Sequence, residues 1–589
     1  MKDFLKYMGA TVVGLILFCI IVTAVGVMSI VGMVASTNAT QKVQENTVLL
    51  VNLNGVMQEQ ADDNLVAQLN GTTGIGLRET LAAIRKAKSN DNIKGIFIEA
   101  GGLIADMAQL EEIRNALVDF KKSKKWIVAH GDSYSQSCYY VSSVADKIYI
   151  NPQGMIDWQG IGGQVTFLKD VYAKVGIKMI PFKCGKYKSA TEIYTEDKMS
   201  AENREQTERY VNGWWQTICR SVSQSRKIPV DSLNAYADRM VSLESAENLK
   251  QYKMVDALLY DDQVKSTVKK MLSVAEDETV NQISVAGMQN VPEENEGDEI
   301  AVYYAYGDIV DEEMPQSMLF SAHTIVGKDV CRDLADLADD DEVKAVVIRV
   351  NSGGGSAYAS EQLWHQIELL KKKKPVVISM GGAAASGGYY MSAAANYIVA
   401  EPTTITGSIG IYSVLRDRSE LMTQKLGFKY DEVKTNRNST MGSEVVPMSA
   451  EQMRYMQGYI DRGYRLFKSR VAQGRNMSME KVEAIAQGHV YLGSDAIKLG
   501  LVDALGGLDV AVAKAAQLAK TESYYTADYP GTVSILDQLL EDGESRYNSI
   551  LDDKLKATLG DFYQPFLLMQ TASFHDGLQA RMPMMITVQ

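Results

Sequence analysis

The chain has 589 residues, of which 46% are hydrophobic, 23% are charged and only 11 are proline. A chain of this length is too long for a single hydrophobic core, and this composition excludes extended disorder. The net charge of −13, without clustered lysine and arginine, argues against a nucleic-acid partner, because neutralising phosphates needs such clusters.

The first predicted element is a membrane span. Residues 8–35 carry no charge and are almost wholly apolar, which is enough to cross about 30 Å of hydrocarbon as a helix. A cleavable signal peptide has an apolar region of only about 7–15 residues, so an uncleaved anchor is favoured, although Ala35 and Ala39 would also suit a cleavage site. Lys2 and Lys6 precede the span, and the positive-inside rule then predicts a cytoplasmic N-terminus, with everything after about residue 40 across the membrane.

After the span the chain repeats itself with a period of 250 residues. Residues 91–98 (DNIKGIFI) resemble residues 341–348 (DEVKAVVI), and Tyr139-Tyr140 returns 250 positions later as Tyr389-Tyr390. The register is kept as far as the MSAE at residue 199, which returns at residue 448. Because the period is as long as a domain, the sequence predicts two copies of one fold and not a solenoid.

Each copy is predicted to be an α/β domain. Short β-branched runs alternate with helical patterns such as residues 359–371, where Leu363, Trp364, Ile367 and Leu370 fall at helical spacing. Such alternation is typical of buried, mostly parallel strands. The predicted strands are Val48–Leu53, Ile93–Ile98, Trp126–His130, Lys147–Ile150, Ile300–Tyr304, Val343–Val350, Pro375–Met380 and Tyr397–Ala400.

The copies are separated by a polar, acidic stretch, residues 291–299, which has no hydrophobic period and indicates a linker. After Glu522 the chain is poorly repeated, and its Met and Leu content suits packing or subunit contact. The predicted division is 1–41 for the N-terminus and transmembrane anchor, 42–274 for the first repeat, 275–299 for the acidic linker, 300–522 for the second repeat, and 523–589 for a helical C-terminal tail.

One serine stands among very small residues. Ser386 lies in GGAAASGGYY (residues 381–390), between a predicted strand and a helical pattern. The amide of Gly387 would then be a free helix N-terminal donor, which a developing oxyanion could use. Alternatively, the small residues permit tight packing and Ser386 merely caps the helix. A second glycine-rich loop, NSGGGS at residues 351–356, also ends a strand, and α/β proteins place their sites where such loops meet.

A nucleophilic serine needs a base, and histidine is not favoured for this role. The histidines occur in segments where a structural histidine is the commoner case. They are His130, His323, His365, His489 and His575. The five cysteines are scattered without CxxC spacing, so the sequence predicts neither a disulfide framework nor a zinc site. No metal or cofactor is predicted.

The comparison of the two copies points to a lysine. The first copy has Gln136 where the second has Ser386, and the second has Ser439 where the first has Lys188. The first copy thus has the lysine without the serine, and the second copy has the serine without the lysine. This is expected if one site is formed by residues of two diverged domains. Lys188 would have to be neutral near pH 7, which burial would promote; a solvated surface lysine is the alternative. The residues alone do not decide among Lys188 and its neighbours at positions 183 and 186, or whether the lysine and serine belong to one chain or to two.

These motifs resemble those of a known protease family. Together with the span and the duplication, Tyr187-Lys188-Ser189-Ala190, Asn351-Ser352-x-Gly354-Gly355 and Ser386-Gly387-Gly388-Tyr389 are similar to the long form of the signal peptide peptidase A family, also called protease IV. The resemblance covers residues 1–520. It implies an α/β fold of two tandem Clp protease/crotonase-like domains with an N-terminal transmembrane helix.

The function implied by the resemblance is a Ser-Lys endopeptidase that degrades cleaved signal peptides and other apolar peptides at the membrane. Family roles then fall on Ser386 as nucleophile, on Lys188 as general base, and on the amides of Gly387 and Gly354 as oxyanion hole. The resemblance also implies a homotetramer in the bacterial inner membrane, with its catalytic domains on the periplasmic side.

The sequence departs from the family pattern at two positions. Gly353 stands where the family usually has proline, and Ile193 follows Glu192 where the family often has proline. Two other functions are alternatives. A crotonase-type enzyme acting on acyl-CoA would need a soluble cofactor and a basic patch for its phosphates. A non-enzymatic membrane scaffold with a vestigial site would tolerate loss of Ser386 or Lys188.

Overall fold

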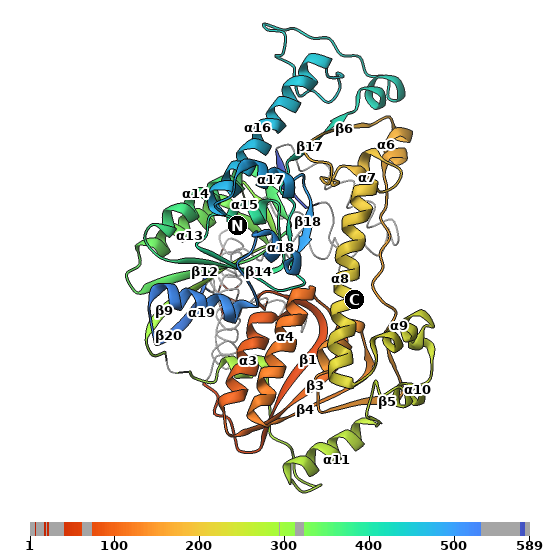
Figure 1. Cartoon of the computed structure of the whole chain (residues 1–589), viewed down its shortest axis with the longest axis vertical. Coiled ribbons are helices and arrows are strands. Elements are labelled where there is room, and N and C mark those ends of the chain that lie inside the picture. Colours follow the sequence, from red (N-terminus) through yellow and green to blue (C-terminus); the bar gives the residue numbers. More distant parts are fainter. Residues whose placement is uncertain are drawn as a thin grey trace.

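The computed structural model contains two α/β units, one above the other along the long axis, and they correspond to the two predicted repeats (Figure 1). Most of the first repeat, coloured red to yellow-green, is the lower unit, and the second repeat, green to blue, is the upper one; residues 169–195 of the first repeat lie beside the upper unit. The structure describes residues 6, 7, 14, 17, 18, 21, 22, 40–61, 74–293, 295–312, 323–531 and 578–582.

The predicted membrane span falls mostly outside the described residues, which include only five positions between 8 and 35. Among the residues that are described, none of the helices combines the length and the hydropathy that a membrane crossing requires.

The first repeat is built on a parallel sheet with strand order β2-β1-β3-β4-β5-β7 and with β8 beside β1. Its strands are β1 (Thr47–Gln58), β2 (Ile75–Gly76), β3 (Ile93–Ile104), β4 (Trp126–Tyr134), β5 (Lys147–Ile156), β6 (Lys178–Lys183), β7 (Ala257–Leu258) and β8 (Gln282–Ser284). Its helices are α3 (Leu77–Ser89), α4 (Met107–Phe120), η1 (Lys121–Ser123), α5 (Gln136–Ser142), α6 (Lys169–Val175), α7 (Glu192–Thr195), α8 (Ala201–Arg226), α9 (Val230–Asp238), η2 (Val241–Leu243), α10 (Ala246–Gln251), α11 (Asp261–Leu272) and α12 (Val285–Gln289).

The second repeat has the strand order β18-β16-β14-β12-β9-β20, with β15 beside β14 and β19 beside β15. Its strands are β9 (Asp298–Tyr306), β10 (Asp308–Val310), β11 (Thr324–Val326), β12 (Val343–Ser352), β13 (Gly354–Ser356), β14 (Val376–Ala385), β15 (Tyr397–Ala400), β16 (Ile405–Gly407), β17 (Tyr412–Asp417), β18 (Val490–Leu492), β19 (Ala504–Leu505), β20 (Tyr524–Tyr529) and β21 (Gln579–Arg581). Its helices are α13 (Gly327–Asp339), α14 (Ala357–Lys371), α15 (Gly387–Ser392), η3 (Leu421–Lys425), α16 (Ala450–Gly474), α17 (Met479–Ile485), α18 (Gly493–Leu499) and α19 (Leu508–Ala519).

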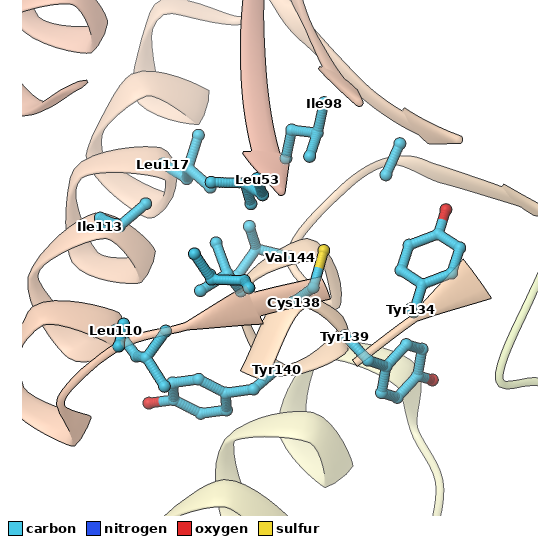
Figure 2. Packing of buried hydrophobic residues seen from close by; sticks show 14 of the residues in the cluster. Leu53, Ile98, Leu110, Ile113, Leu117, Tyr134, Cys138, Tyr139, Tyr140 and Val144 are labelled. Carbon is cyan, nitrogen blue, oxygen red and sulfur yellow. The ribbon is translucent and has the colours of Figure 1, made fainter. Parts of the chain in front are cut away.

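All eight predicted strands are present in the structure. They could be predicted because strands covered on both faces have continuous apolar sequences. Figure 2 shows the packing in the first repeat, where Leu110, Ile113 and Leu117 of α4 lie on the side facing Leu53 and Ile98 of the sheet. All five side chains are fully buried, and each contributes about 1.5–3 kcal/mol by leaving water. Helical spacing on α4 and alternation on the strands therefore bring one apolar face of each element together.

The duplication extends to side-chain contacts. The hydroxyl of Tyr139 donates to Met254 O at 2.9 Å, and that of Tyr389 donates to Leu501 O at 2.9 Å. Both tyrosines hold the short helix that follows the third main strand of their repeat. Tyr139 and Tyr389, which are 250 positions apart in the sequence, therefore occupy equivalent positions in the two repeats.

A third sheet joins the repeats, in the order β11-β10-β13-β21-β17-β6. Its outermost strand, β6, comes from the first repeat and pairs antiparallel with β17 of the second, Pro181 lying opposite Val414. The long helix α8 then runs along both units (Figure 1), and Trp214 in it donates to Thr403 O of the second repeat at 2.9 Å. The segment between β6 and α8 is therefore held against the second repeat.

The structure corrects the predicted division at two places. Residues 275–299, predicted to be a linker, contain β8 and α12, and Met288 of α12 is fully buried in the first core. The tail after 522 was predicted to be helical, but its described residues form strands: β20 is parallel to β9, and β21 lies in the third sheet. Both errors involve elements of six residues or fewer, in which no hydrophobic period can develop. Residues 532–577 and 583–589 lie outside the described part.

Candidate active site

Ser386 occupies a strained turn between β14 and α15. Its φ is 53° and its ψ is −111°, which is uncommon for a residue with a Cβ and costs about 1–3 kcal/mol. The backbone is fixed there because Ser386 N donates to Gly407 O at 2.8 Å. The Ser386 side chain makes no capping hydrogen bond to α15. The interpretation of Ser386 as a plain helix cap is therefore wrong, and the turn directs its hydroxyl elsewhere.

The hydroxyl of Ser386 meets the amine of Lys188. Lys188 Nζ lies 2.8 Å from Ser386 Oγ, 3.0 Å from Ser408 Oγ and 3.1 Å from Ser408 O. Both Lys188 and Ser386 are fully buried. Because these three oxygens are neutral, no ion pair offsets the cost of burying a charge, and burial lowers the pKa of Lys188 well below its usual value. The site thus favours a neutral amine beside a serine hydroxyl.

Lys188 reaches this position because its backbone packs closely on the second repeat. Tyr187 N donates to Gln487 O at 2.9 Å, and a Cβ on Gly488 would come within 2.7 Å of Lys188 N. Glycine at 488 therefore permits the approach. Of the other two lysines in this segment, Lys186 is exposed and Lys183 is half-buried. Of these three lysines, Lys188 is the one that the structure places beside Ser386, and both residues belong to one chain.

Ser408 was missed by the sequence analysis. It is fully buried, has a φ of 51°, and is held by a hydrogen bond from its backbone nitrogen to His489 O at 2.7 Å. Its hydroxyl and carbonyl both face the amine of Lys188. Ser408 is 220 positions from Lys188 in the chain, and the one local signal was its place between Gly407 and Gly410.

The two glycines predicted to form an oxyanion hole lie against each other. Gly354 has a φ of 104°, and a Cβ placed on it would stand 2.6 Å from the amide nitrogen of Gly387. A side chain at Gly354 would thus be both strained and obstructed. Gly354 N itself lies 3.1 Å from Ser352 Oγ, to which it donates. The amide of Gly387 beside a buried serine can stabilise a negative oxygen, whereas the amide of Gly354 would have to leave Ser352 Oγ to do the same.

The first repeat holds the glycine-rich loop of residues 351–356 in place. Asn351, at the end of β12, donates to Glu59 Oε1 at 2.7 Å and to Asp106 Oδ2 at 3.0 Å, both in the first repeat. Its Oδ1 accepts from Ala383 N of β14 at 3.0 Å. Arg349, two residues earlier and 1% exposed, lies between Glu59 (2.8 Å) and Glu112 (2.6 Å). This buried polar cluster ties the strand before the loop to the neighbouring unit.

Comparison with known proteins identifies the group to which this arrangement belongs. The chain matches peptidase family S49 over residues 119–275 and again over residues 368–522, which together make up more than half of its length. The chain belongs to peptidase family S49. A Clp protease match over residues 316–404 agrees with the α/β fold of the second repeat.

Curated relatives of this S49 peptidase extend over most of its length. "Protease 4" of Salmonella typhi is 34% identical over 575 residues, which cover 94% of this chain and 91% of that protein. "Protease 4" of Haemophilus influenzae is 33% identical over 84% of each chain. "Serine protease SPPA, chloroplastic" of Arabidopsis thaliana is 31% identical over 81% of this chain and 70% of that protein. The chain is therefore a serine-type peptidase with two tandem S49 domains.

Within its described residues, the S49 peptidase has one buried serine at a strained strand-to-helix turn, namely Ser386. The equivalent turn of the first repeat is not strained. There the helix begins one residue earlier, and Ser135 is an ordinary cap whose Oγ accepts from Cys138 N at 3.2 Å. Gln136, the counterpart of Ser386, lies within α5 and accepts from Gly160 N at 3.0 Å. Ser439, the counterpart of Lys188, lies on an exposed loop and accepts from Asn436 N at 3.1 Å.

Within the described residues, Ser386 makes no hydrogen bond to a histidine ring. The ring of His130 contacts Asp261 at 3.3 Å, and that of His489 stacks on Tyr491 and meets Tyr187 edge to face. The backbone carbonyl of His489, but not its ring, supports Ser408. His575 lies outside the described residues.

Proposed function

We propose that this chain is a membrane-anchored endopeptidase with a Ser-Lys dyad that degrades cleaved signal peptides and other apolar peptides. The observation that carries the proposal is the 2.8 Å contact between Lys188 Nζ and Ser386 Oγ in a fully buried site. A neutral amine at hydrogen-bond distance from a hydroxyl is the geometry that general-base activation of a serine needs.

The proposed mechanism uses residues of both repeats. Lys188 removes the proton of Ser386 as Oγ adds to a peptide carbonyl, and the amides of Gly387 and Gly354 hold the resulting oxyanion. Lys188 then gives the proton to the leaving nitrogen, and afterwards activates the water that hydrolyses the acyl-enzyme. Ser408 holds the lysine toward the nucleophile throughout, since its hydroxyl and carbonyl both lie within 3.1 Å of Nζ.

An extended apolar peptide suits this site. The glycine-rich loop continues directly into β13, which pairs with β10 on one side and with β21 on the other. A substrate strand that displaced β21 would pair with β13 through its main chain in the same way. The residues before Ser386, from Gly381 to Ala385, carry at most a methyl group and are buried, so the strand packs closely on its neighbours as far as the turn. Signal peptides are apolar segments left in the membrane, and the apolar residues 8–35 would hold the peptidase beside them.

The anchor and its orientation are part of the proposal. Residues 8–35 have the length of a membrane-spanning helix, and the preceding Lys2 and Lys6 favour a cytoplasmic N-terminus. The two S49 domains would then lie on the periplasmic side of a bacterial inner membrane. A protease-protection assay on spheroplasts, with an epitope after residue 531, would detect the opposite orientation.

We also propose that the chain forms a homotetramer, and the duplication supports this. In the first repeat, residues 178–183 form β6 and pair with residues 412–417. By the repeat, residues 429–434 correspond to the former and residues 162–167 to the latter. Both of these segments are without strand pairing in the described structure and are largely exposed. Pairing of 429–434 with 162–167 of the next copy would repeat the contact head to tail, which produces a ring when the rotation closes.

The test of the proposed function is hydrolysis of a synthetic signal peptide by the detergent-solubilised full chain. The wild type should cut it, Ser386→Ala should not, and a polar soluble peptide of equal length should be cut at least tenfold more slowly. Circular dichroism would establish that the variant is folded. If the wild type cuts neither peptide, the membrane scaffold becomes the better hypothesis; if it cuts both equally, the substrate class is wrong.

A further inference from the structure

One buried amide on α8 connects the two segments that surround the amine of Lys188. Gln206 is 1% exposed, and it lies on the helix that runs beside β18 (Figure 1). Its Nε2 donates to Tyr187 O and to Ser189 Oγ, both at 3.2 Å. Its Oε1 accepts from Val490 N, also at 3.2 Å. One side chain therefore binds the residues on both sides of Lys188 and a strand of the second repeat.

The strand that Gln206 binds is also the one that supports Ser408. β18 begins at Val490 and pairs antiparallel with β16. The preceding residue, His489, accepts a hydrogen bond from Ser408 N at 2.7 Å through its carbonyl. Ser408 in turn supplies two of the three oxygens around the amine of Lys188. Gln206 thus joins the backbone that carries the lysine to the backbone that holds its hydrogen-bond partner.

The partners of Gln206 require an amide at this position. The carbonyl of Tyr187 can only accept a hydrogen bond, and the backbone nitrogen of Val490 can only donate one. An amide side chain satisfies both groups, because it has a donor and an acceptor. A carboxylate would satisfy only Val490, and a hydrocarbon side chain would satisfy neither.

The other end of the lysine segment is bound to the same helix. Glu192, which is 3% exposed, accepts from Ser200 Oγ at 2.6 Å and from Asn203 Nδ2 at 3.0 Å. Ser200 is the N-cap of α8, and Asn203 lies three residues before Gln206. Residues 187–192 are therefore bound at both ends to the first turns of α8.

The second repeat, which lacks the lysine, also lacks this glutamine. At the 249-residue offset of the MSAE motif, the counterpart of Gln206 is Tyr455. Tyr455 is 50% exposed, and its hydroxyl donates to Glu451 Oε1 at 2.6 Å on the same helix. The buried glutamine is thus present in the repeat whose lysine has to be positioned and absent from the other.

We propose that Gln206 is a positioning residue, which holds the backbone around Lys188 so that the amine stays buried beside Ser386, an inference that rests on the proposed Ser-Lys activity. Gln206 acts through Lys188, because its hydrogen bonds go to the residues before and after the lysine. Without these bonds the segment can separate from β18. The amine then becomes hydrated and keeps its proton more readily.

Burial is the cause of the lowered pKa of Lys188. The charged or titratable groups on the elements around it include Lys183, Lys186 and Glu192 of its own segment, Glu205 and Arg209 of α8, and His489 before β18. All of these groups are kept when Gln206 is replaced by an uncharged residue. A change in the pKa of Lys188 in such a variant therefore reports a change in the burial of its amine.

The first experiment measures signal-peptide hydrolysis by the detergent-solubilised full chain carrying Gln206→Met, which keeps the length of the side chain without its hydrogen bonds. kcat should fall about 10–100-fold with little change in KM, because the base is displaced but the peptide-binding surface is kept. The acidic limb of kcat/KM against pH should move to higher pH, and each unit of that movement lowers the neutral fraction of the lysine about tenfold.

Gln136→Met is the matched control. Gln136 is also a buried glutamine of the first repeat, but its side chain bonds to the backbone of residues 159 and 160, so this variant should match the wild type. Circular dichroism establishes that each variant is folded. If Gln206→Met does not fold, Gln206→Asn replaces it: its amide is one methylene shorter and cannot reach both partners, and the limb should move in the same direction by less.

The second experiment needs no substrate. Between the lowered folded pKa of Lys188 and about 10.4, the unfolded chain holds a proton that the folded chain has released. Lys188→Met should therefore raise the melting temperature at pH 7. In the Gln206→Met or Gln206→Asn background the amine is already partly hydrated, so adding Lys188→Met should raise the melting temperature by less than it does in the wild type.

The outcomes separate this role of Gln206 from the proposed function. If the wild type is active and Gln206→Met keeps its kcat, or loses kcat with an unshifted acidic limb, the positioning role is refuted and the function stands. An equal loss of activity in Gln136→Met also refutes it. If the wild type hydrolyses no signal peptide, the proposed function is refuted, and the second experiment alone decides about Gln206: equal gains from Lys188→Met in both backgrounds would show that Gln206 does not keep the amine buried.

Discussion

Replacing Lys188 distinguishes a general base from a buried cation that merely attracts charge. An ordinary lysine, with a pKa of about 10.4, is neutral in only about one molecule in 10³ at pH 7.4. Burial lowers the pKa of Lys188, and each unit of that shift makes the neutral form about tenfold more abundant, equivalent to about 1.4 kcal/mol of barrier. The activity kcat/KM should therefore rise with pH to a plateau reached well below pH 10.4.

Three variants make the test specific. Lys188→Arg keeps a cation that cannot be deprotonated, and Lys188→Met keeps the length without a base. Both should lose about 10²–10⁴ in kcat/KM. Lys186→Met, which changes an exposed lysine of the same segment, should match the wild type. The assay is signal-peptide hydrolysis between pH 5 and 10, and a Lys188→Met enzyme that retains a tenth of wild-type activity would show that the base lies elsewhere.

Lys188→Met should also change how the free energy of unfolding depends on pH. Below about pH 10.4 the unfolded chain binds a proton at Lys188 that the folded chain has released. The free energy of unfolding of the wild type therefore rises with pH between the lowered folded pKa and about 10.4. Lys188→Met removes this dependence, so at pH 7 the variant should melt at a higher temperature than the wild type. A lower melting temperature would indicate that the buried amine is stabilised by contacts beyond its three neutral oxygens.

Three further predictions concern the surroundings of the site. Ser408→Ala removes one of the two Ser408 oxygens that hold Lys188; kcat should fall about tenfold with little change in KM, whereas an unchanged kcat would exclude a positioning role. Glu401 is buried, and its burial together with the nearby Glu111 raises its pKa to about 9. The folded chain then holds a proton that the unfolded chain releases above about pH 4.5, so stability falls as the pH rises toward 9; Glu401→Gln should flatten this fall by up to about 1.4 kcal/mol per pH unit, measured as melting temperature at pH 6 and pH 8. Val433 is 98% exposed within the segment proposed to pair with another copy; Val433→Pro should reduce the mass of the assembly by light scattering, whereas an unchanged mass would place the subunit contact elsewhere.

The sequence by itself determined the duplication and the positions of the eight main strands, and it limited the lysine that accompanies Ser386 to positions 183, 186 and 188. Apolar periodicity is a local property of the chain, so buried strands and long helices can be predicted without knowledge of their neighbours. The repeat offset added one piece of non-local information. It placed the two copies in register, and the residue that each copy had lost then indicated a site shared between them.

Only the tertiary structure decided how that site is assembled. Lys188 and Ser386 are 198 positions apart, and burial, which sets the pKa of the lysine, exists only once both repeats are packed together. The strain at Ser386, the support from Ser408 and the place of β21 beside Gly354 likewise depend on contacts between distant segments. Short elements such as β8, α12 and β21 contain too few residues for a period, and the partner surfaces that stabilise them are formed by the folded sheets.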